Sequence, residues 1–312
     1  MNLFFNVKNM NLKQFIQEIS PTQGEISRIS ISWNEIRETI QQKSEIINYS
    51  FLTGSYSRHT KIHPIDDLDI FFRIDFSNTW YQEYNRQYII YIEEDKLYNH
   101  QLKDFIVDFD WKKCISPIKI INRIWSIVKN RYSTTNEQWR NWECYTAFFS
   151  SYNLTIDCVP YCKVNDGDFF LIPKWWNNIY WKRTNPTIDN EKINELNNFY
   201  DGKLKDIIKV LKYWNKKYNE SRFKSYHLEC LIYYGFQEKC NINMSYIELI
   251  QKVLEYIYDN LNKYQNIIDL PRFDYMYFDF SDNQKNMILK SIEAFYDTLK
   301  YWEENVVSYL KN

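Results

Sequence analysis

Residues 51–72, FLTGSYSRHTKIHPIDDLDIFF, decide the fold of this chain. A Gly54-Ser55 turn follows one apolar run, and Asp67 and Asp69 lie in the next. Because side chains alternate between the two faces of a strand, these two carboxylates are expected to point the same way. Two like charges side by side repel and are costly to bury unless a cation neutralises them. Hard oxygen ligands of this kind favour Mg²⁺ held together with substrate phosphates.

The Gly54-Ser55 turn supplies a second part of the pattern. Glycine lets a backbone approach a phosphate, and the amides at the helix start that follows form an anion site. A bare Asp-x-Asp would be better explained as a surface hairpin with a charged edge. The turn at this distance, with apolar residues around the acidic pair, favours a metal-phosphate site.

These residues carry a family resemblance. Gly54-Ser55 followed by Asp67-Leu-Asp69-Ile resembles the signature of the polymerase-β-like nucleotidyltransferases. The resemblance implies an α+β fold, with a palm of mixed sheet and helices, a C-terminal helical lobe, and an active site in the cleft between the lobes. We expect residues 1–185 to form the catalytic lobe with an N-terminal spine helix, and 186–312 to form the helical lobe that completes the donor-nucleotide site.

The composition is that of a globular protein with room for two lobes. The chain has 312 residues, 45% of them hydrophobic, and few Gly or Pro. Its net charge of −1 gives no indication of a large basic surface, so long nucleic acid is not an expected partner. No stretch has the length of a signal sequence or a membrane span. The six cysteines contain no CxxC pair, which predicts free thiols in a reduced, cytoplasmic protein without membrane association.

Periodicity gives a coarse secondary structure. Residues 11–43 read as helical with a break near Pro21, and residues 78–115 remain unassigned. Ser281 and Gln284 form an expected capping box. The other predicted elements are strands 48–53 and 67–74, helix 118–128, a hairpin of 144–150 and 154–159, and helices 190–218, 225–236, 245–263 and 282–310.

Asp157 is the third candidate carboxylate. It lies in the predicted strand LTIDCVP, which is expected to stop at Pro160. Alone it would be a strand-end residue, but beside the Asp67–Asp69 strand it completes three carboxylates, the minimum for two-metal phosphoryl transfer. In the resembled family the third carboxylate lies on such a strand, and Asp-apolar-Val-Pro is typical of its second-messenger branch.

Further candidates lie in the predicted helical lobe. On a helical wheel Lys212 is closest to the edge of an apolar stripe, whereas Lys205, Lys209 and Lys216 are expected to form a solvated face. Ser225 is an N-cap or a contact for a terminal phosphate. Tyr226 is a core residue or a stacking platform for a base.

Leu-Lys212-Tyr-Trp-Asn followed by Lys-Ser225-Tyr226-His-Leu-Glu resembles the donor-triphosphate segment of CD-NTases. These bacterial enzymes are related to cyclic GMP-AMP synthase and oligoadenylate synthetase. The resemblance implies that the lysine and serine hold the triphosphate and that the tyrosine stacks on a base. It extends in order over residues 11 to 310, but includes neither the zinc-binding insertion of the animal DNA sensor nor a small-residue tail for conjugation.

The leading hypothesis is an enzyme that joins NTPs into a cyclic di- or trinucleotide messenger and releases pyrophosphate. Asp67, Asp69 and Asp157 would bind two Mg²⁺ ions, with Mn²⁺ as an alternative, while Gly54 and Ser55 would hold the donor triphosphate with the helical-lobe residues. The resemblance implies CBASS-type antiphage defence and a downstream effector that binds the product. Two alternatives remain: nucleotide addition to RNA or protein, and a pseudoenzyme scaffold that only binds nucleotides.

Overall fold

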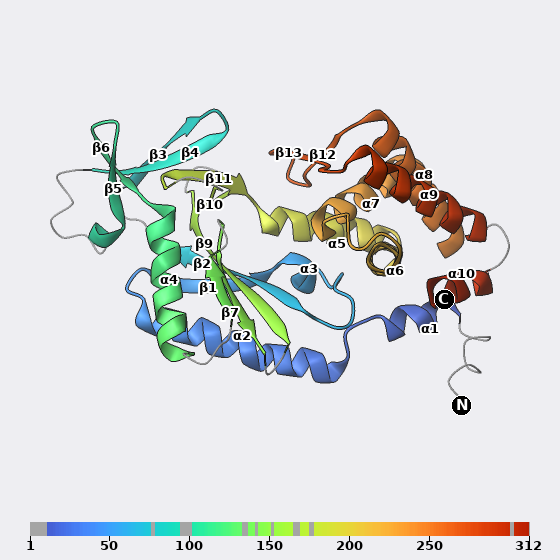
Figure 1. The fold of residues 1–312 in the computed structure, drawn as a ribbon, viewed down its shortest axis with the longest axis horizontal. Coiled ribbons are helices and arrows are strands. Elements are labelled where there is room, and N and C mark those ends of the chain that lie inside the picture. Colours follow the sequence, from blue (N-terminus) through green and yellow to red (C-terminus); the bar gives the residue numbers. More distant parts are fainter. Residues whose placement is uncertain are drawn as a thin grey trace. The chain divides into compact units, whose positions relative to one another are not determined.

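A computed structural model describes residues 11–75, 79–93, 102–132, 137–140, 143–150, 153–164, 169–174, 178–299 and 303–311. The chain divides into two compact units (Figure 1). The sheet unit comprises Gln23–Tyr56 and Ile65–Pro186. The helical unit comprises the described parts of Met1–Thr22, Ser57–Pro64 and Thr187–Asn312.

These units differ from the predicted lobes, 1–185 and 186–312, in two segments. Helix α1 (Leu12–Glu18) and the segment Ser57–Pro64 belong to the helical unit. The cause is apolar burial, since Leu12 and Phe15 of α1 and Ile62 of the segment lie in the core of the helical unit.

The sheet unit contains one large sheet. Its main path runs β1-β2-β9-β10-β11-β4-β6-β5, with β3 paired to β4, β8 to β9, and β7 to β8. The strands are β1 (Ile47–Thr53), β2 (Asp67–Ile74), β3 (Thr79–Tyr84), β4 (Gln87–Ile92), β5 (Ile106–Phe109), β6 (Lys112–Ile115), β7 (Glu137–Arg140), β8 (Tyr145–Phe149), β9 (Leu154–Lys163), β10 (Phe170–Pro173) and β11 (Tyr180–Thr184). Its helical elements are α2 (Gln23–Lys43), α4 (Pro117–Arg131) and a 3-10 turn at Lys103–Phe105, and α3 (Gly54–Ser57) runs from this unit into the helical one.

Alternation along β2 and β9 gives the sheet two different faces. On β2, Leu68, Ile70, Phe72 and Ile74 are buried in the same core as the apolar residues of α2 and α4. These two helices pack against one another beside the strands (Figure 1). The intervening residues of β2 and β9 therefore face away from α2 and α4, and they include the three candidate carboxylates.

The helical unit is built around a second core. Its helices are α1, α5 (Pro186–Phe199), α6 (Lys203–Tyr218), α7 (Ser225–Lys239), α8 (Tyr246–Lys263), α9 (Asp282–Leu299) and α10 (Glu303–Lys311), with a small sheet of β12 (Asn266–Ile268) and β13 (Tyr275–Tyr277). Helix α7 is buried from Leu228 to Phe236 on every side, so it forms the centre of this unit. Within the described ranges, no helix is both long and apolar enough to cross a membrane.

Most predicted elements agree with the structure. The helical region 11–43 is α1 and α2, the strand pair around Gly54 is β1 and β2, and the helices 118–128, 225–236 and 245–263 are α4, α7 and α8. The hairpin is β8 and β9, although residues 151–152 of its turn lie outside the described residues. The capping box is confirmed by reciprocal bonds between Ser281 and Gln284.

Two predicted helices are wrong in extent. The helix 190–218 is two helices, α5 and α6, because Asp201 and Gly202 take positive φ angles of 51° and 87° that end a right-handed helix. The helix 282–310 is α9 and α10, and residues 300–302 between them lie outside the described residues.

The predicted stop at Pro160 is also wrong, because β9 continues to Lys163. Pairing of β9 with β8 ends at Cys158, and pairing with β10 begins at Cys162. Pro160 falls in the interval between these two ladders, where a missing N–H costs the sheet little. The unassigned region 78–115 contains β3 to β6, whose short strands carry too weak a period to be recognised.

Candidate active site

The register of β2 and β9 places the candidate carboxylates together. These strands are parallel, with Asp69 directly paired with Asp157 and Asp67 with Thr155. Paired residues of neighbouring strands point to the same face, so all three carboxylates leave the face opposite α2 and α4. Asp67 is exposed, whereas Asp69 and Asp157 are half-buried. The sheet therefore presents a row of acidic groups at one end of the β2–β9 strand pair.

Gly54 fits closely against this row. It has a φ of +69°, and a β-carbon built on it would lie 2.9 Å from the carboxyl carbon of Asp69. Both the backbone angle and this distance exclude a side chain, so glycine is required here. Ser55, in the first turn of α3, is buried. The predicted pairing of the Gly-Ser turn with the acidic strand is thus present in the sheet unit.

Asp157 also bonds to a residue of β8, the second strand that pairs with this part of β9. Thr146 is its direct partner in the antiparallel ladder and donates a hydrogen bond of 2.6 Å from Oγ1 to Oδ1. Burial raises the pKa of Asp157 above its usual value, and hydrogen bonds from Thr146 and Cys144 counteract part of this rise. The nearby Glu143 carboxylate raises it further.

Asp67, Asp69 and Asp157 offer the oxygen ligands that a magnesium site needs, although their side chains are not gathered around one point. Among the described residues, no three His, Cys, Asp or Glu side chains form a group that could enclose a metal. Like charges on adjacent strands repel when no cation lies between them. Carboxylate oxygens are the ligands that Mg²⁺ prefers, and the close approach of Gly54 leaves backbone, without a side chain, beside Asp69.

In the helical unit, Lys212 is part of a buried ionic cluster. The Glu229 carboxylate has an exposed fraction of 0% and accepts bonds from Arg58 and Thr60, each at 2.7 Å, and from Lys212. Burial alone would raise the pKa of Glu229, but Arg58 and Lys212 outweigh it and hold that pKa well below the usual range. Burial lowers the pKa of Lys212, and Glu229 opposes the change. The expected cleft-facing lysine is therefore an internal ion-pair partner in this structure.

Ser225 and Tyr226 begin α7. Ser225 is exposed and is the first residue of the helix, while the cap position is Lys224, which forms no side-chain capping bond. The N-cap interpretation of Ser225 is therefore wrong by one residue. Tyr226 is half-buried, donates its hydroxyl proton to Asp189 at 2.7 Å, and has the Arg58 guanidinium 5.5 Å from its ring centre.

The expected solvated lysine face is correct only for Lys216, which is exposed. Lys209, on α6, donates a hydrogen bond of 3.0 Å to Ser20 Oγ, and Ser20 lies just after the end of α1. Lys205 donates to Asn194 at 2.6 Å. Both lysines are half-buried because α1 and α5 pack against α6, which a helical wheel of α6 alone does not reveal.

Sequence reasoning missed the partners of the candidate residues. Glu229 could have been recognised from the sequence, since it is the one acidic residue in the apolar run HLECLIYYGF. An unpaired charge in such a run would be costly, so a buried cationic partner could have been expected. Arg58 had a weaker signal, as a cation just after the Gly-Ser turn. Asp189 and Thr146 had none, because only the tertiary fold brings them to Tyr226 and Asp157.

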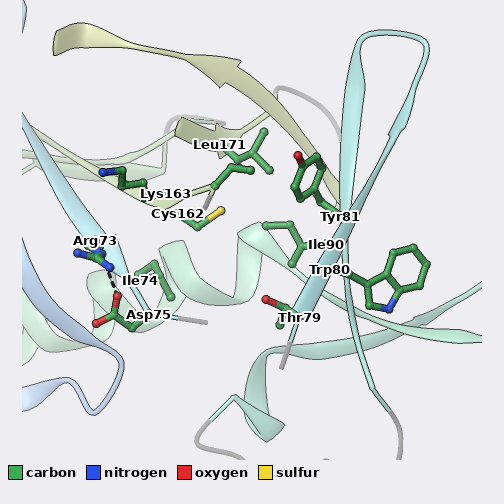
Figure 2. A pocket seen from close by; sticks show the side chains of 11 residues that line it. Arg73, Ile74, Asp75, Thr79, Trp80, Tyr81, Ile90, Cys162, Lys163 and Leu171 are labelled. Carbon is green, nitrogen blue, oxygen red and sulfur yellow. Dashed lines mark ion pairs between the residues drawn. The ribbon is translucent and has the colours of Figure 1, made fainter. Parts of the chain in front are cut away.

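A cavity of about 430 Å³ opens at the other end of the same strands (Figure 2). Arg73 and Asp75 of the β2 end form an ion pair there, and Lys163 lies at the end of β9. Tyr81 of β3 faces them across the cavity, whereas the Trp80 ring lies on the other side of that strand (Figure 2). None of the candidate site residues lines it.

Solved structures share this arrangement of elements over nearly the whole chain. CdnC of E. coli MS115-1 matches with a TM-score of 0.65 in its complex with HORMA-deltaN, at 12% identity and over 97% of this chain and 96% of that one. The same protein with ATP matches with a TM-score of 0.66, at 12% identity, over 96% and 95% of the two chains. The fold is that of a nucleotidyltransferase.

Sequence comparison narrows this class. Residues 7–88 match the Second Messenger Oligonucleotide or Dinucleotide Synthetase domain family. A probable cyclic nucleotide synthase of Bacillus cereus (strain VD146) is 31% identical over 199 residues, 62% of this chain and 56% of that relative. A cyclic AMP-AMP-AMP synthase of Acinetobacter sp. (strain ATCC 27244 / 9458) is 23% identical over 273 residues, 83% of this chain and 66% of that relative. The chain is therefore similar to cyclic nucleotide synthases, and it spans less than two thirds of the length of these two relatives.

Proposed function

We propose that this chain is a nucleotidyltransferase that joins NTPs into a cyclic di- or trinucleotide and releases pyrophosphate. One observation carries the proposal: Asp69 and Asp157 are in register on adjacent parallel strands, with the backbone of Gly54 against Asp69. Two carboxylates side by side repel one another, and a bound metal cation would relieve that repulsion. The curated relatives, whose names state cyclic nucleotide synthesis, support this reaction class.

The carboxylates would act on the acceptor and on the reacting phosphate. Asp67, Asp69 and Asp157 would hold two Mg²⁺ ions, or Mn²⁺, which would neutralise phosphate charge and lower the pKa of the acceptor ribose hydroxyl. Asp157, bonded to Thr146 on one oxygen, would orient the acceptor. The Gly54 and Ser55 backbone would hold the donor phosphates. In such a transfer the protein contributes mainly positioning and charge.

Lys212, Ser225 and Tyr226 would bind the donor nucleotide. Ser225 is exposed at the first turn of α7, where amide groups and a hydroxyl suit a terminal phosphate. Lys212 would exchange Glu229 for that phosphate. Glu229 would then keep its bonds to Arg58 and Thr60, so the release of Lys212 would leave no buried charge without a partner. Tyr226 would offer its ring to a base while its hydroxyl stays on Asp189.

The resemblance to CD-NTases supports a proposal for the biological setting. We propose a cytoplasmic enzyme of CBASS-type antiphage defence whose product binds a downstream effector. The net charge of −1 supports a reaction that needs no long nucleic acid.

The test is incubation of the chain with radiolabelled ATP, GTP, CTP and UTP and Mg²⁺, followed by phosphatase. A phosphatase-resistant, low-molecular-weight product is expected, because a cyclic phosphodiester has no terminal phosphate. Label that is retained on added RNA or on protein would instead support the transfer of nucleotides to a macromolecule. Absence of any transfer, with NTP binding intact, would support a nucleotide-binding scaffold.

A further inference from the structure

Thr146 occupies an unusual position for a buried threonine. It lies on β8 with an exposed fraction of 1%, and the ladder pairs it directly with Asp157. Its Oγ1 donates to Oδ1 of Asp157 at 2.6 Å. Cys144 lies two residues earlier, just before β8 begins, with Sγ 3.5 Å from that Oγ1. A buried hydroxyl and a buried thiol thus converge on one candidate catalytic carboxylate.

A carboxylate on a strand needs such a bond to have one orientation. Rotation about the last side-chain bond of aspartate is broad, so the position of its two oxygens is poorly defined by the backbone. Asp157 also lies in register with a second carboxylate, Asp69. Repulsion alone would turn the Asp157 carboxylate away from Asp69, whereas the Thr146 bond holds Oδ1 toward β8.

We propose that Thr146 is a positioning residue for Asp157, fixing the rotation of that carboxylate for the acceptor side of the reaction. This inference rests on the proposed function. It differs from a packing role, because valine fills the same volume and suits a buried strand equally well but cannot donate. Serine donates the same bond with less volume. The two substitutions therefore separate the hydroxyl from the methyl group.

The experiment compares Thr146→Val, Thr146→Ser and Thr184→Val in the full chain. Thr184 is the matched control, a threonine on β11 of the same unit that lies outside the site. Product formation is followed as kcat and KM for NTP, and the melting temperature is measured with and without Mg²⁺. Thr146→Val should lower kcat about tenfold or more, since a bond to a charged group is lost, with KM nearly unchanged. It should also need more Mg²⁺ for half-maximal stabilisation.

Thr146→Ser should recover most of kcat, and Thr184→Val should match the wild type. Wild-type kcat in Thr146→Val would overturn the inference while leaving the proposed function intact. Equal loss in the valine and serine variants would assign Thr146 to packing and would also overturn it. If Thr146→Val does not fold, Thr146→Ala against Thr146→Ser gives the same comparison. A wild-type chain that forms no product would overturn the proposed function and this inference together.

Discussion

Glu229 in the helical unit and Asp157 in the sheet unit are both at least partly buried carboxylates, but their surroundings differ. In the helical unit, Glu229 is fully enclosed and contacts two cations and a hydroxyl. In the sheet unit, Asp157 accepts a bond from the neutral Thr146 hydroxyl and lies in register with a second carboxylate, Asp69. The first carboxylate is paired with cations. The second lies beside another carboxylate.

The difference separates a structural role from a functional one. A compensated buried ion pair specifies how segments pack, and here it joins Ser57–Pro64 to α6 and α7. A row of carboxylates on adjacent strands is disfavoured by mutual repulsion. The proposed Mg²⁺ ions would offset that repulsion. We therefore expect substitutions in the two groups to have opposite effects on stability and activity.

The largest stability effect is expected at Glu229. Glu229→Ala leaves Arg58 and Lys212 as buried cations without their carboxylate, which should cost about 3–5 kcal/mol of unfolding free energy. Urea unfolding at neutral pH measures it. Glu220→Ala is the control, because this carboxylate is exposed and its loss should cost within about 0.5 kcal/mol. A cost below about 1 kcal/mol for Glu229→Ala would remove the distinction between the two carboxylate groups.

Substitution of Lys212 is expected to change both the stability of the fold and the KM for NTP. Lys212→Ala should be less destabilising than Glu229→Ala, because Glu229 keeps Arg58 and Thr60. It should also raise KM for NTP about tenfold or more, since a charged phosphate contact is lost. Lys216→Ala, on the exposed side of α6, should be silent in both assays. Identical KM values in the two variants would exclude Lys212 from the donor site.

A pH effect is expected at Asp189, because burial raises its pKa to about 6 from a reference value of 3.8. The unfolded chain releases this proton at lower pH than the folded chain does, so the Asp189 contribution to stability falls as pH rises from about 4 to about 6. Asp189→Asn cannot ionise. The unfolding free energy of Asp189→Asn minus that of the wild type should therefore rise over that interval and level off above it. Unfolding at pH 4, 5, 6 and 7 tests this, and a constant difference would contradict the shift.

The smallest stability effect is expected at Ser225. Because no side-chain capping bond is made at the start of α7, Ser225→Ala should change unfolding free energy within about 0.5 kcal/mol. A measurable rise in KM for NTP is expected from the lost phosphate contact. Melting temperature and KM measured together decide the role. A loss of about 1 kcal/mol with unchanged KM would restore the simple cap interpretation.

The sequence predicted the sheet side of the candidate site well, for a local reason. Asp67, Asp69 and Gly54 belong to one short stretch, and the strand period fixes the direction of their side chains. Asp157 was recognisable because an acidic residue interrupts an apolar strand. The fold class was implied by the resemblance to the polymerase-β-like nucleotidyltransferases that these motifs carry.

The surroundings of these residues could not be predicted, because they depend on contacts between distant segments. Lys212 looked like a residue at the edge of a stripe, but Arg58 and Glu229 enclose it from two other segments. Lys209 was expected to be solvated, but in the structure it bonds to Ser20, just after α1. Thr146 gave no signal, since only the β8–β9 register aligns it with Asp157.

The most direct test of the account is Asp157→Asn, measured for product and for melting temperature. The amide oxygen can still accept from Thr146, and one charge leaves an acidic row, so the fold should be at least as stable as the wild type. The account predicts no phosphatase-resistant product from a variant with an unchanged or higher melting temperature. Wild-type rates of product formation in this variant would contradict the assignment of the acidic row as the active site.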